Sequence, residues 1–269
     1  MRRNTVLTRI MASGVAAIML CAGGTFTVNA AEEEPVKADV SVKAIQGLSD
    51  DFIGGMDVSS MLSLEESGVT FKNANGEVED LFTLLKESGV NYVRLRVWND
   101  PFTADGQGYG GGNVNADRAL TMAKRATAAG LKVGVYFFTQ AVDEVEAVQE
   151  ASMVLDRISG YKISYPVFLD VEGSGGRGDK IDSATRTAVC KAFCNTIQNA
   201  GYTAGVYANK TWLSQKMDAS ALSGYKIWLA QYAAAPTYTG RYDLWQYKST
   251  GKVSGISGNV DLNLSYLGY

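Results

Sequence analysis

The 269-residue sequence contains no histidine. This absence excludes Ser-His-Asp and Cys-His catalysis, and it excludes zinc sites that depend on imidazole ligands. Any acid or base chemistry must therefore fall to carboxylates, tyrosine, lysine or cysteine.

Cysteine is also scarce, with three residues in the chain. Cys21 lies in an N-terminal apolar run, while Cys190 and Cys194 are four residues apart in a helical pattern. That spacing puts the last two side chains on one face of a helix, where disulfide geometry is awkward. We therefore expect two buried thiols in the mature chain rather than a disulfide.

The N-terminus has the pattern of a secretory signal peptide. Three arginines precede an apolar run from Ile10 to Ala22, and Val28 and Ala30 supply the small residues of a cleavage site. The run of about 13 residues is too short to span a bilayer comfortably. We predict a signal peptide over 1–30, a secreted, extracellular and cell-wall-associated protein, and no stable membrane insertion after cleavage. The alternative is an uncleaved N-terminal anchor.

The charge balance disfavours polyanionic partners. Loss of three arginines with the signal peptide leaves 22 basic residues (25 − 3) against 28 acidic ones, a net charge of −6. Nucleic acid and anionic membrane surfaces are therefore poor partners. Residues 31–51 have the composition of a flexible acidic leader, and residues 52–269 suffice for one barrel with a large core. We expect this domain to be a monomer.

Apolar strand patterns alternate with amphipathic helical patterns along the chain. The eight expected strands span Phe52–Val58, Asn91–Val97, Lys132–Phe138, Pro166–Val171, Thr203–Tyr207, Lys226–Gln231, Asp243–Tyr247 and Val260–Asn263. The four expected helices span Val78–Ser88, Ala116–Ala129, Val142–Ser159 and Ser183–Ala200. Each helix ends near a glycine, a short helix follows Lys210, and only polar, glycine-containing links follow the sixth strand. The pattern predicts an α/β fold, an irregular (β/α)8 TIM-type barrel with eight strands and missing late helices, with a doubly wound sheet as the alternative.

The stretch YPVFLDVEGSGGRG contains the spacing G-x-G-x-x-G at Gly173, Gly175 and Gly178. A dinucleotide site needs such glycines between a strand end and a helix start, where the pyrophosphate meets the helix N-terminus. Here two carboxylates precede the glycines and would repel phosphate, and the next helix begins several residues later. The sequence therefore disfavours a nucleotide site, and we expect no cofactor.

The same stretch ends a predicted strand on two carboxylates, Asp170 and Glu172. Residues i and i+2 of a strand face the same side, about 6.5–7 Å apart, and the carboxyl ends of barrel strands are where catalytic sites form. Asp57 ends the first expected strand, while Asp261 ends or follows the last. Because these two strands are neighbours in a closed barrel, the four acids should converge on one mouth, where one carboxyl pKa can rise into the range of a general acid.

Two other interpretations of these acids stay open. They could be solvated side chains at strand ends, or they could hold a divalent metal ion. Since no calcium-loop spacing occurs in the sequence, we expect no metal.

Aromatic residues are frequent at the expected strand ends. Sugar rings stack on aromatic faces, and tyrosine also hydrogen-bonds sugar hydroxyls. The set is Trp98, Tyr136, Tyr207, Trp228, Tyr232, Trp245 and Tyr247. Each ring alone is explained by packing, but the set around an acidic mouth favours a carbohydrate. The predicted substrate-binding residues are Arg94, Tyr136, Tyr207, Trp228, Tyr232 and Gln246.

From about Gly130 to Tyr269 the chain resembles glycoside hydrolase family 25, the lysozymes that cleave peptidoglycan at N-acetylmuramic acid. The stretches AGLKVGVYFF, YPVFLDVEGSGG, AGYTAGVYAN, IWLAQY and LWQYKSTGKVSGISGNVDLN carry the resemblance. It implies that Glu172 is the general acid and that Asp170 steadies the oxocarbenium-like or oxazoline-like intermediate. Asp57 and Asp261 resemble supporting acids that orient and tune this pair.

From about Phe52 to Lys132 the chain instead resembles glycoside hydrolase family 53, the endo-β-1,4-galactanases. The stretches that carry this resemblance are FIGGMDVSSMLSLEESGV, GVNYVRLRVWNDP and DGQGYGGGN. In that family both catalytic glutamates come from later strands, which this chain lacks, so the resemblance implies that galactanase chemistry is not retained. We expect a single hybrid barrel, galactanase-like over 52–132 and lysozyme-like over 133–269.

The sequence thus predicts a secreted glycosidase that cleaves the β-1,4 bonds of peptidoglycan, or of another β-linked polysaccharide, with Glu172 as general acid. Charge at C1 would be stabilised by Asp170 or trapped by the substrate's own N-acetyl group. The alternatives are an endo-β-1,4-galactanase-like enzyme and a catalytically weak, carbohydrate-binding hybrid barrel.

Overall fold

A computed structural model describes residues 53–73, 75–97, 114–251 and 259–267. The predicted signal peptide and acidic leader lie outside these residues, as does Trp98. No helix among the described residues is long and apolar enough to cross a bilayer.

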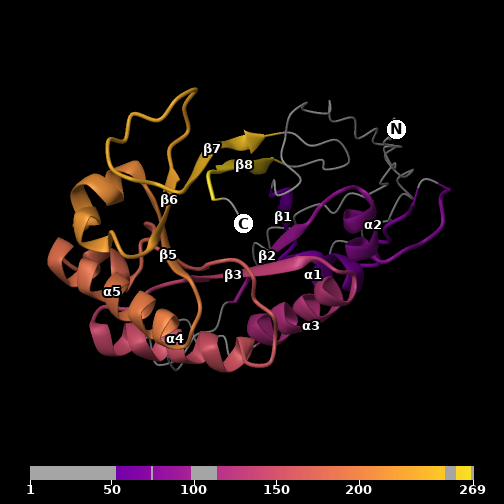
Figure 1. Cartoon of the computed structure of the whole chain (residues 1–269), viewed down its shortest axis with the longest axis horizontal. Helices are drawn as coiled ribbons and strands as arrows, with labels where there is room; N and C mark the ends of the chain where they lie inside the picture. Colours follow the sequence, from indigo (N-terminus) through magenta and orange to yellow (C-terminus); the bar gives the residue numbers. More distant parts are fainter. Residues whose placement is uncertain (1–52, 74, 98–113, 252–258, 268–269) are drawn as a thin grey trace, which may run out of the picture.

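The described residues form one curved, eight-stranded sheet whose strands follow the order of the sequence (Figure 1). The strands are β1 (Gly55–Asp57), β2 (Tyr92–Arg96), β3 (Lys132–Phe138), β4 (Val167–Asp170), β5 (Ala204–Asn209), β6 (Lys226–Ala230), β7 (Leu244–Gly251) and β8 (Val260–Ser265). The first seven strands are parallel neighbours, and β8 pairs antiparallel with β7. The predicted α/β fold, an irregular (β/α)8-type barrel with eight strands, is confirmed.

The direction of the last strand differs from the expectation. Among the described residues β8 pairs with β7 and not with β1, so the expected pairing of the first and last strands is wrong there. Because β8 is antiparallel, its beginning lies at the edge of the sheet where the parallel strands end. Asp261, the second residue of β8, therefore starts the last strand rather than ending it.

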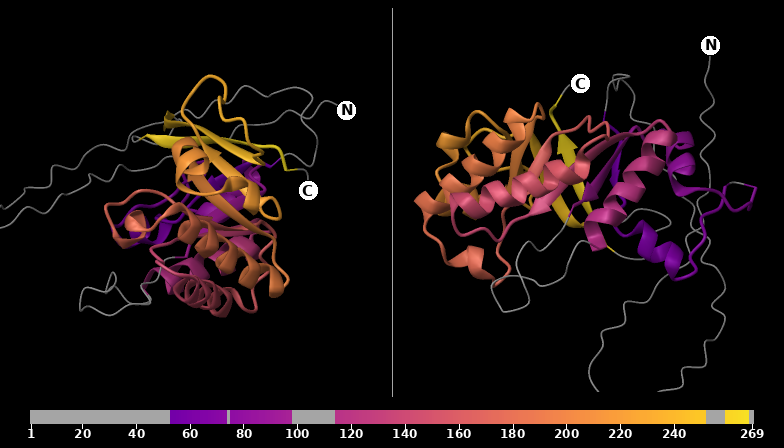
Figure 2. Two further views of the ribbon diagram at one scale, coloured as in Figure 1. Left: turned by 90° about the vertical axis from the view of Figure 1, so that its left-hand side faces the viewer. Right: turned by 90° about the horizontal axis from the view of Figure 1, so that it is seen from below.

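Three long helices cover the outer face of the sheet, namely α3 (Val114–Ala128), α4 (Glu144–Ile158) and α5 (Ser183–Asn199). They lie side by side in the views of Figures 1 and 2, and α4 packs against α5. Asp143 and Asp182 cap the N-termini of α4 and α5 by accepting backbone N–H bonds. Glycines with positive φ follow each of the three helices, at Gly130, Gly160 and Gly201, as their spacing predicts.

The shorter helices differ more from the sequence pattern. Helix α1 (Met61–Glu66) was not expected. Helix α2 (Leu81–Glu87) begins three residues later than expected, because Asp80 caps it and Val78, two residues before the cap, forms a bridge with Lys72. The π-helical turn η2 (Trp212–Lys216) and the 3-10 turn η3 (Ala219–Leu222) confirm the short helical segment after Lys210. No helix lies in the described link between β6 and β7.

Aromatic side chains fill the interior of the barrel below the mouth. Phe168, Trp228 and Leu244 form a buried cluster against Tyr136 and Tyr207. The backbone of β5 leaves room for it, since a Cβ at position 205 would lie 2.4 Å from the Phe168 ring and 2.8 Å from a main-chain oxygen of β6. The cluster gives the mouth a rigid, apolar floor.

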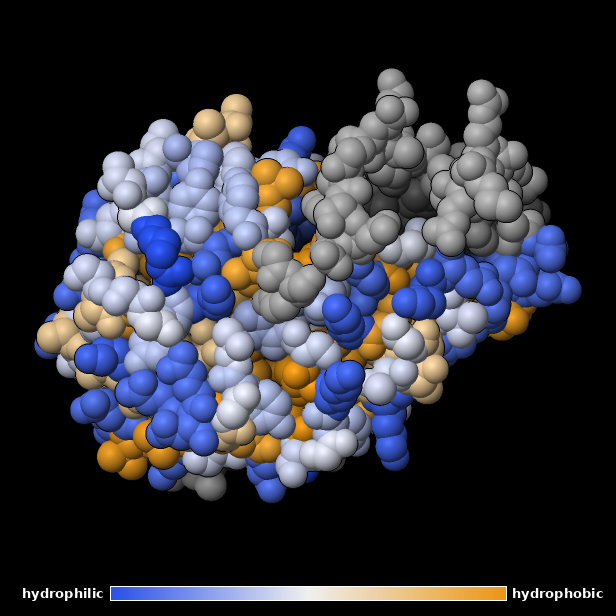
Figure 3. Space-filling view, in the orientation of Figure 1, coloured by the Kyte–Doolittle hydropathy of each residue, from blue (hydrophilic) through white to orange (hydrophobic). Residues whose placement is uncertain are grey.

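A larger core packs the helices against the outside of the sheet. Cys190 and Cys194 lie in it as free, buried thiols, which confirms the prediction for this pair. The face seen in Figure 3 is mostly hydrophilic, with hydrophobic side chains in small patches.

Candidate functional site

The described strand ends surround a cavity of about 330 Å³. It is lined by Arg94 and Arg96 of β2, Tyr136 and Phe138 of β3, Asp170 and Glu172 at β4, Tyr207 of β5, Trp228 of β6, Gln246 of β7 and Asp261 of β8. Three of the four predicted acids thus share one cavity, at the carboxyl ends of the parallel strands.

Asp170 is the buried member of the acidic pair. Its side chain is 8% exposed, and its Oδ1 atom has no hydrogen-bond partner among the described residues. Burial and, to a smaller extent, the charge of Glu172 raise the pKa of this carboxyl, the two arginines of β2 oppose the shift, and the resulting pKa is about 8. A raised pKa of this size favours the protonated form of Asp170 near neutral pH.

Glu172 is the exposed member of the pair. Partial desolvation raises its pKa, and the charge of Asp261 adds to the effect. Glu172 thus shares the cavity with two other acids, Asp170 at the end of β4 and Asp261 on β8. Such neighbours favour the protonated form that a general acid needs.

Asp57 has a different environment from the one expected. It is not among the residues that line the cavity. Its carboxylate accepts hydrogen bonds from the backbone N–H and hydroxyl of Ser59, at 2.9 and 2.5 Å, and from Arg94 Nε at 2.8 Å. Among the described contacts, Asp57 therefore supports Arg94 rather than the Asp170–Glu172 pair.

Arg94 lines the cavity and packs against two of its aromatic rings. Its guanidinium carbon lies 4.6 Å from the ring centre of Tyr136 and 4.4 Å from that of Trp228. These are cation–π distances. Together with the Asp57 ion pair, the two rings hold the guanidinium in one place.

The other predicted substrate-binding residues lie in or beside the same cavity. Gln246 Oε1 accepts hydrogen bonds from the hydroxyls of Tyr207 and Tyr232, at 2.8 and 3.0 Å. Trp228 Nε1 donates to Asn263 Oδ1 of β8 at 2.9 Å. Tyr232 is 58% exposed and lies beside the cavity without lining it, so it is placed to extend the binding surface outward.

Two aromatic residues of the predicted set do not reach the mouth. Trp245 is buried in the core outside the sheet, where its indole N–H donates to the Gln231 carbonyl at 2.8 Å, and Tyr247 packs on it. Neighbouring strand residues face opposite sides, so Gln246 takes the inward position. The same alternation would have found two lining residues that the prediction missed, Arg96 and Phe138, each two positions beyond a predicted one.

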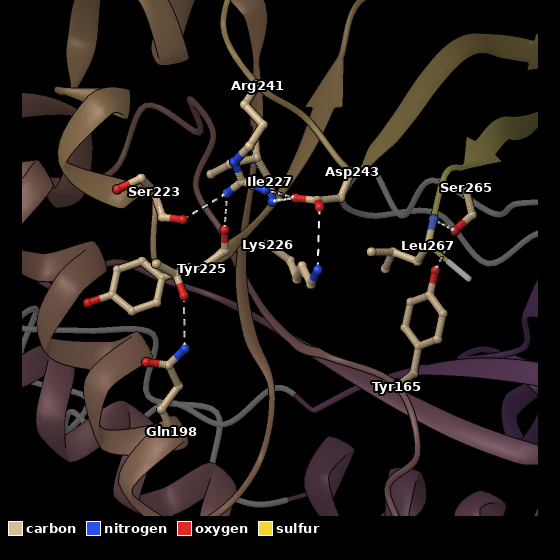
Figure 4. A network of polar contacts seen from close by, with 11 residues as sticks. Tyr165, Gln198, Ser223, Tyr225, Lys226, Ile227, Arg241, Asp243, Ser265 and Leu267 are labelled. Carbon is tan, nitrogen blue, oxygen red and sulfur yellow. Dashed lines mark hydrogen bonds and ion pairs between the residues drawn. The ribbon is translucent and has the colours of Figure 1, made fainter. Parts of the chain in front are cut away.

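The strands that carry Trp228 and Gln246 are tied together at their other end by a polar network (Figure 4). The carboxylate of Asp243 accepts a bond from the Ile227 N–H at 2.8 Å and forms ion pairs with Arg241 at 2.5 Å and Lys226 at 3.5 Å. This network helps to set the register of β6 against β7, and hence the positions of Trp228 and Gln246 along the barrel axis.

The glycine-rich loop after Glu172 is held by hydrogen bonds to two side chains, Asp179 and Gln140. Asp179 accepts the N–H groups of Ser174 and Gly175, at 3.0 and 2.7 Å. Gln140 Oε1 accepts the N–H of Gly178 at 3.2 Å, and a Cβ at position 176 would lie 2.0 Å from the same oxygen. The glycines therefore allow a tight, fixed loop beside Glu172.

Arg186 supports this loop from below. The side chain is buried, and it donates to the carbonyls of Gly178, Ile181 and Lys216 at 3.0, 3.1 and 2.8 Å. Its guanidinium carbon lies 4.5 Å from the ring centre of Trp212. A buried arginine that bonds only to carbonyls in this way fixes the backbone rather than a substrate.

Glu150 of α4 is a second buried acid and supports the residues that hold the loop. It is 1% exposed and accepts bonds from the Thr139 hydroxyl at 2.6 Å and the Gln140 N–H at 3.2 Å. Burial raises its pKa from 4.5 to about 8, against the effect of these bonds. The folded protein therefore keeps a proton that the unfolded chain loses above about pH 4.5.

The raised pKa of Glu150 predicts a pH-dependent stability. Its contribution to stability is full below about pH 4.5 and falls as the pH rises to about 8, by an amount on the order of a few kcal/mol. We expect Glu150→Gln to match the parent protein in urea unfolding at pH 4.5 and to exceed it at pH 8.5. A variant that is equally destabilised at both values would contradict this assignment.

The described residues contain no group of three or more His, Cys, Asp or Glu side chains arranged to hold a metal ion. The acids of the mouth are accompanied instead by arginines and aromatic rings. This arrangement suits proton transfer next to a sugar ring.

Comparison with known proteins connects the chain to two groups of glycoside hydrolases. The family model for glycosyl hydrolase family 53 matches residues 53–139. An endo-beta-1,4-galactanase of Bacillus subtilis is 56% identical over 95 residues, which are 35% of this chain and 22% of that protein. An arabinogalactan endo-beta-1,4-galactanase of Thermothelomyces thermophilus is 46% identical over 83 residues, 31% of this chain and 23% of that one. The chain thus spans about a fifth of the length of these curated relatives.

Solved structures with a similar fold include members of both groups. A family 25 glycosyl hydrolase from Bacillus anthracis has a TM-score of 0.58 at 17% identity, covering 85% of this chain and 95% of that one. The GH53 catalytic domain of Ignisphaera aggregans has a TM-score of 0.53 at 22% identity, covering 72% and 63%. These likenesses establish the fold. The similarity to family 53 in sequence is limited to the first strands, and the similarity to family 25 in these comparisons is one of fold.

Proposed function

We propose that the chain is a glycoside hydrolase in which Glu172 and Asp170 cleave β-1,4 bonds of peptidoglycan. The observation that carries the proposal is the acidic pair at the end of β4, with one carboxyl exposed and one buried in the same aromatic-lined cavity. Two carboxyls in unlike environments are the usual requirement for splitting acid and stabilising roles in glycoside hydrolysis.

The chemistry follows from the positions of the two carboxyls. Glu172, at the exposed rim, donates its proton to the glycosidic oxygen as the bond to C1 breaks. The positive charge that develops at C1 is stabilised by ionised Asp170 or trapped by the N-acetyl group of the substrate. Tyr136, Tyr207 and Trp228 offer faces and hydroxyls to the sugar ring.

The position of the three acids along the chain supports the lysozyme-type assignment. Residues 53–139 contribute Arg94, Arg96, Tyr136 and Phe138 to the cavity, and none of these is a carboxylic acid. All three acids that line it lie beyond residue 139. They belong to the stretches that resemble family 25 lysozymes, including the D-V-E sequence of Asp170 to Glu172.

Hydrolysis of β-1,4-galactan is the second candidate, and the identity of 56% to a galactanase over 95 residues favours it. Against it, Glu172 is the one glutamate among the described residues of the cavity lining, whereas the galactanase resemblance calls for two. A barrel that binds polysaccharide without cleaving it is the third candidate. In all three cases we propose that the N-terminal signal peptide directs the protein out of the cell, where such polysaccharides occur.

Release of reducing ends separates the three candidates. Purified protein is incubated with peptidoglycan and, in parallel, with β-1,4-galactan, and Glu172→Gln serves as the inactive control. We expect product from peptidoglycan with the parent protein alone. Product from galactan only would favour the second candidate, and sedimentation with peptidoglycan without any product would favour the third.

A further inference from the structure

Arg94 is the charged residue of the mouth whose position is best fixed. Its Nε forms an ion pair with the Asp57 carboxylate at 2.8 Å. Its guanidinium carbon lies 4.6 Å from the ring centre of Tyr136 and 4.4 Å from that of Trp228. Its side chain is 23% exposed. A guanidinium that packs against two rings and is ion-paired with a carboxylate has little surface left for a sugar, so direct binding of substrate is a poor account of its role.

Asp170 is the buried acid of the cavity on which the charge of Arg94 acts. Both residues line the same cavity, and Asp170 Oδ1 is buried without a hydrogen-bond partner among the described residues. A buried carboxyl responds strongly to a fixed charge because little water screens the interaction. The charged and titratable groups that line the cavity with Asp170 are Glu172 just after β4, Arg94 and Arg96 on β2, Tyr136 on β3, Tyr207 on β5 and Asp261 on β8, and Asp57 of β1 is ion-paired with Arg94.

The proposed reaction needs a particular arrangement of protons. Glu172 must carry the proton that it donates, while Asp170 must be ionised to stabilise the charge at C1. Burial works against this arrangement, since it penalises the ionised form of Asp170 more than that of the exposed Glu172. A fixed positive charge beside Asp170 is the feature that can oppose burial.

We infer that Arg94 is a positioning residue for the proton of this pair: held by Asp57, Tyr136 and Trp228, its charge opposes the effect of burial on Asp170, makes ionisation of Asp170 easier and so favours a proton on Glu172. Asp57 then acts through Arg94, which explains why a predicted member of the acidic cluster lies outside the cavity lining. Arg96 adds positive charge from the same strand, but its exposure to solvent weakens the effect.

This inference rests on the proposed function, because the position of the proton matters only if Glu172 and Asp170 are the catalytic pair. Its test measures titration and does not require turnover. Carboxyl carbons of ¹³C-labelled aspartate and glutamate are titrated by NMR between pH 3 and pH 10 in the parent protein and in Arg94→Met. Asp170→Asn and Glu172→Gln assign the two signals. We expect Asp170 to titrate about one pH unit higher in Arg94→Met, and Glu172 to titrate lower.

Three further variants separate the effect of the Arg94 charge from other effects of the substitution. Arg94→Lys retains the charge and should keep Asp170 within about half a unit of the parent protein. Arg96→Met removes the exposed arginine and should shift Asp170 by less than half as much as Arg94→Met. Arg94→Gln replaces Arg94→Met if the latter does not fold.

An unchanged Asp170 titration in a folded, charge-removing Arg94 variant would overturn the inference. An equal shift in Arg96→Met would also overturn it, because the fixed position of Arg94 would then be irrelevant. A parent protein that fails to cleave peptidoglycan would contradict the proposed function without changing the titration result. The failure of the proposed function and the failure of this inference are therefore distinguishable.

Discussion

Glu172→Gln is expected to lower the rate of peptidoglycan hydrolysis by about 1,000-fold, with the fold unchanged. General acid catalysis contributes roughly 10²–10⁴ to such rates, and glutamine keeps the shape of the side chain without a proton to donate. The loss should fall on kcat more than on KM, because the exposed side chain acts on the leaving oxygen. Initial rates of reducing-end release, with circular dichroism as the check on folding, measure the effect.

Glu144→Gln is a matched control for this change. Glu144 is an exposed residue in the first turn of α4, away from the cavity lining. We expect it to retain the parent rate within a factor of two or so. A Glu172→Gln protein that is folded and as active as this control would show that Glu172 is not the general acid.

Asp170→Asn is expected to change activity and stability in opposite directions. Hydrolysis should fall by at least about 100-fold, because the neutral amide cannot stabilise the positive charge at C1. Stability should rise in alkaline solution, because the buried carboxyl with no described hydrogen-bond partner must ionise there and asparagine need not.

The sign of the stability effect follows from the raised pKa of Asp170. Below its ordinary value of 3.8, the carboxyl is protonated in the folded and unfolded chains alike, and the substitution has little effect through this group. As the pH rises to about 8, the unfolded chain loses the proton and the folded chain keeps it, so the parent protein becomes less stable by an amount on the order of a few kcal/mol. Urea unfolding at pH 4 and pH 9 should therefore show a gap between variant and parent at the higher pH only. A variant that is less stable than the parent at pH 9 would contradict the burial and the raised pKa assigned to this carboxyl.

The sequence was sufficient for the number and order of the strands. Each strand is a short apolar segment between turn residues, and the glycines after the long helices adopt the positive φ that their spacing suggested. It was not sufficient for the direction of β8, because an alternating pattern is the same for parallel and antiparallel strands. Helix α1 was missed because its six residues carry little periodicity and its N-cap residue makes no side-chain hydrogen bond to the helix.

The site was predictable where chemistry follows directly from strand periodicity. The i, i+2 spacing of Asp170 and Glu172 put both carboxyls at the mouth, and the same rule explains why Arg96 and Phe138 line it. Asp57 could not be placed from sequence, since its position depends on an ion pair with Arg94 of the next strand, 37 residues away. Pairwise contacts of this kind depend on three-dimensional proximity, which residue patterns do not encode.

The mouth is also where the galactanase-like part of the chain meets the lysozyme-like part. Arg94, within the segment matched by family 53, stacks on Trp228, which lies outside it. The contact joins a cation from one part to the aromatic floor beneath the acids of the other. We therefore expect the activity of the acidic pair to depend on this contact, because it holds the positive charge of Arg94 near Asp170.

Identification of the new reducing end tests the central claim most directly. Peptidoglycan is digested with the parent protein or with Glu172→Gln, the products are reduced with borohydride, and the terminal sugars are identified by mass spectrometry. We predict reduced N-acetylmuramic acid ends with the parent protein and none above background with the variant. The same ends in equal amount from both proteins, or none from a folded parent protein, would contradict the assignment of Glu172 and Asp170 as the catalytic pair.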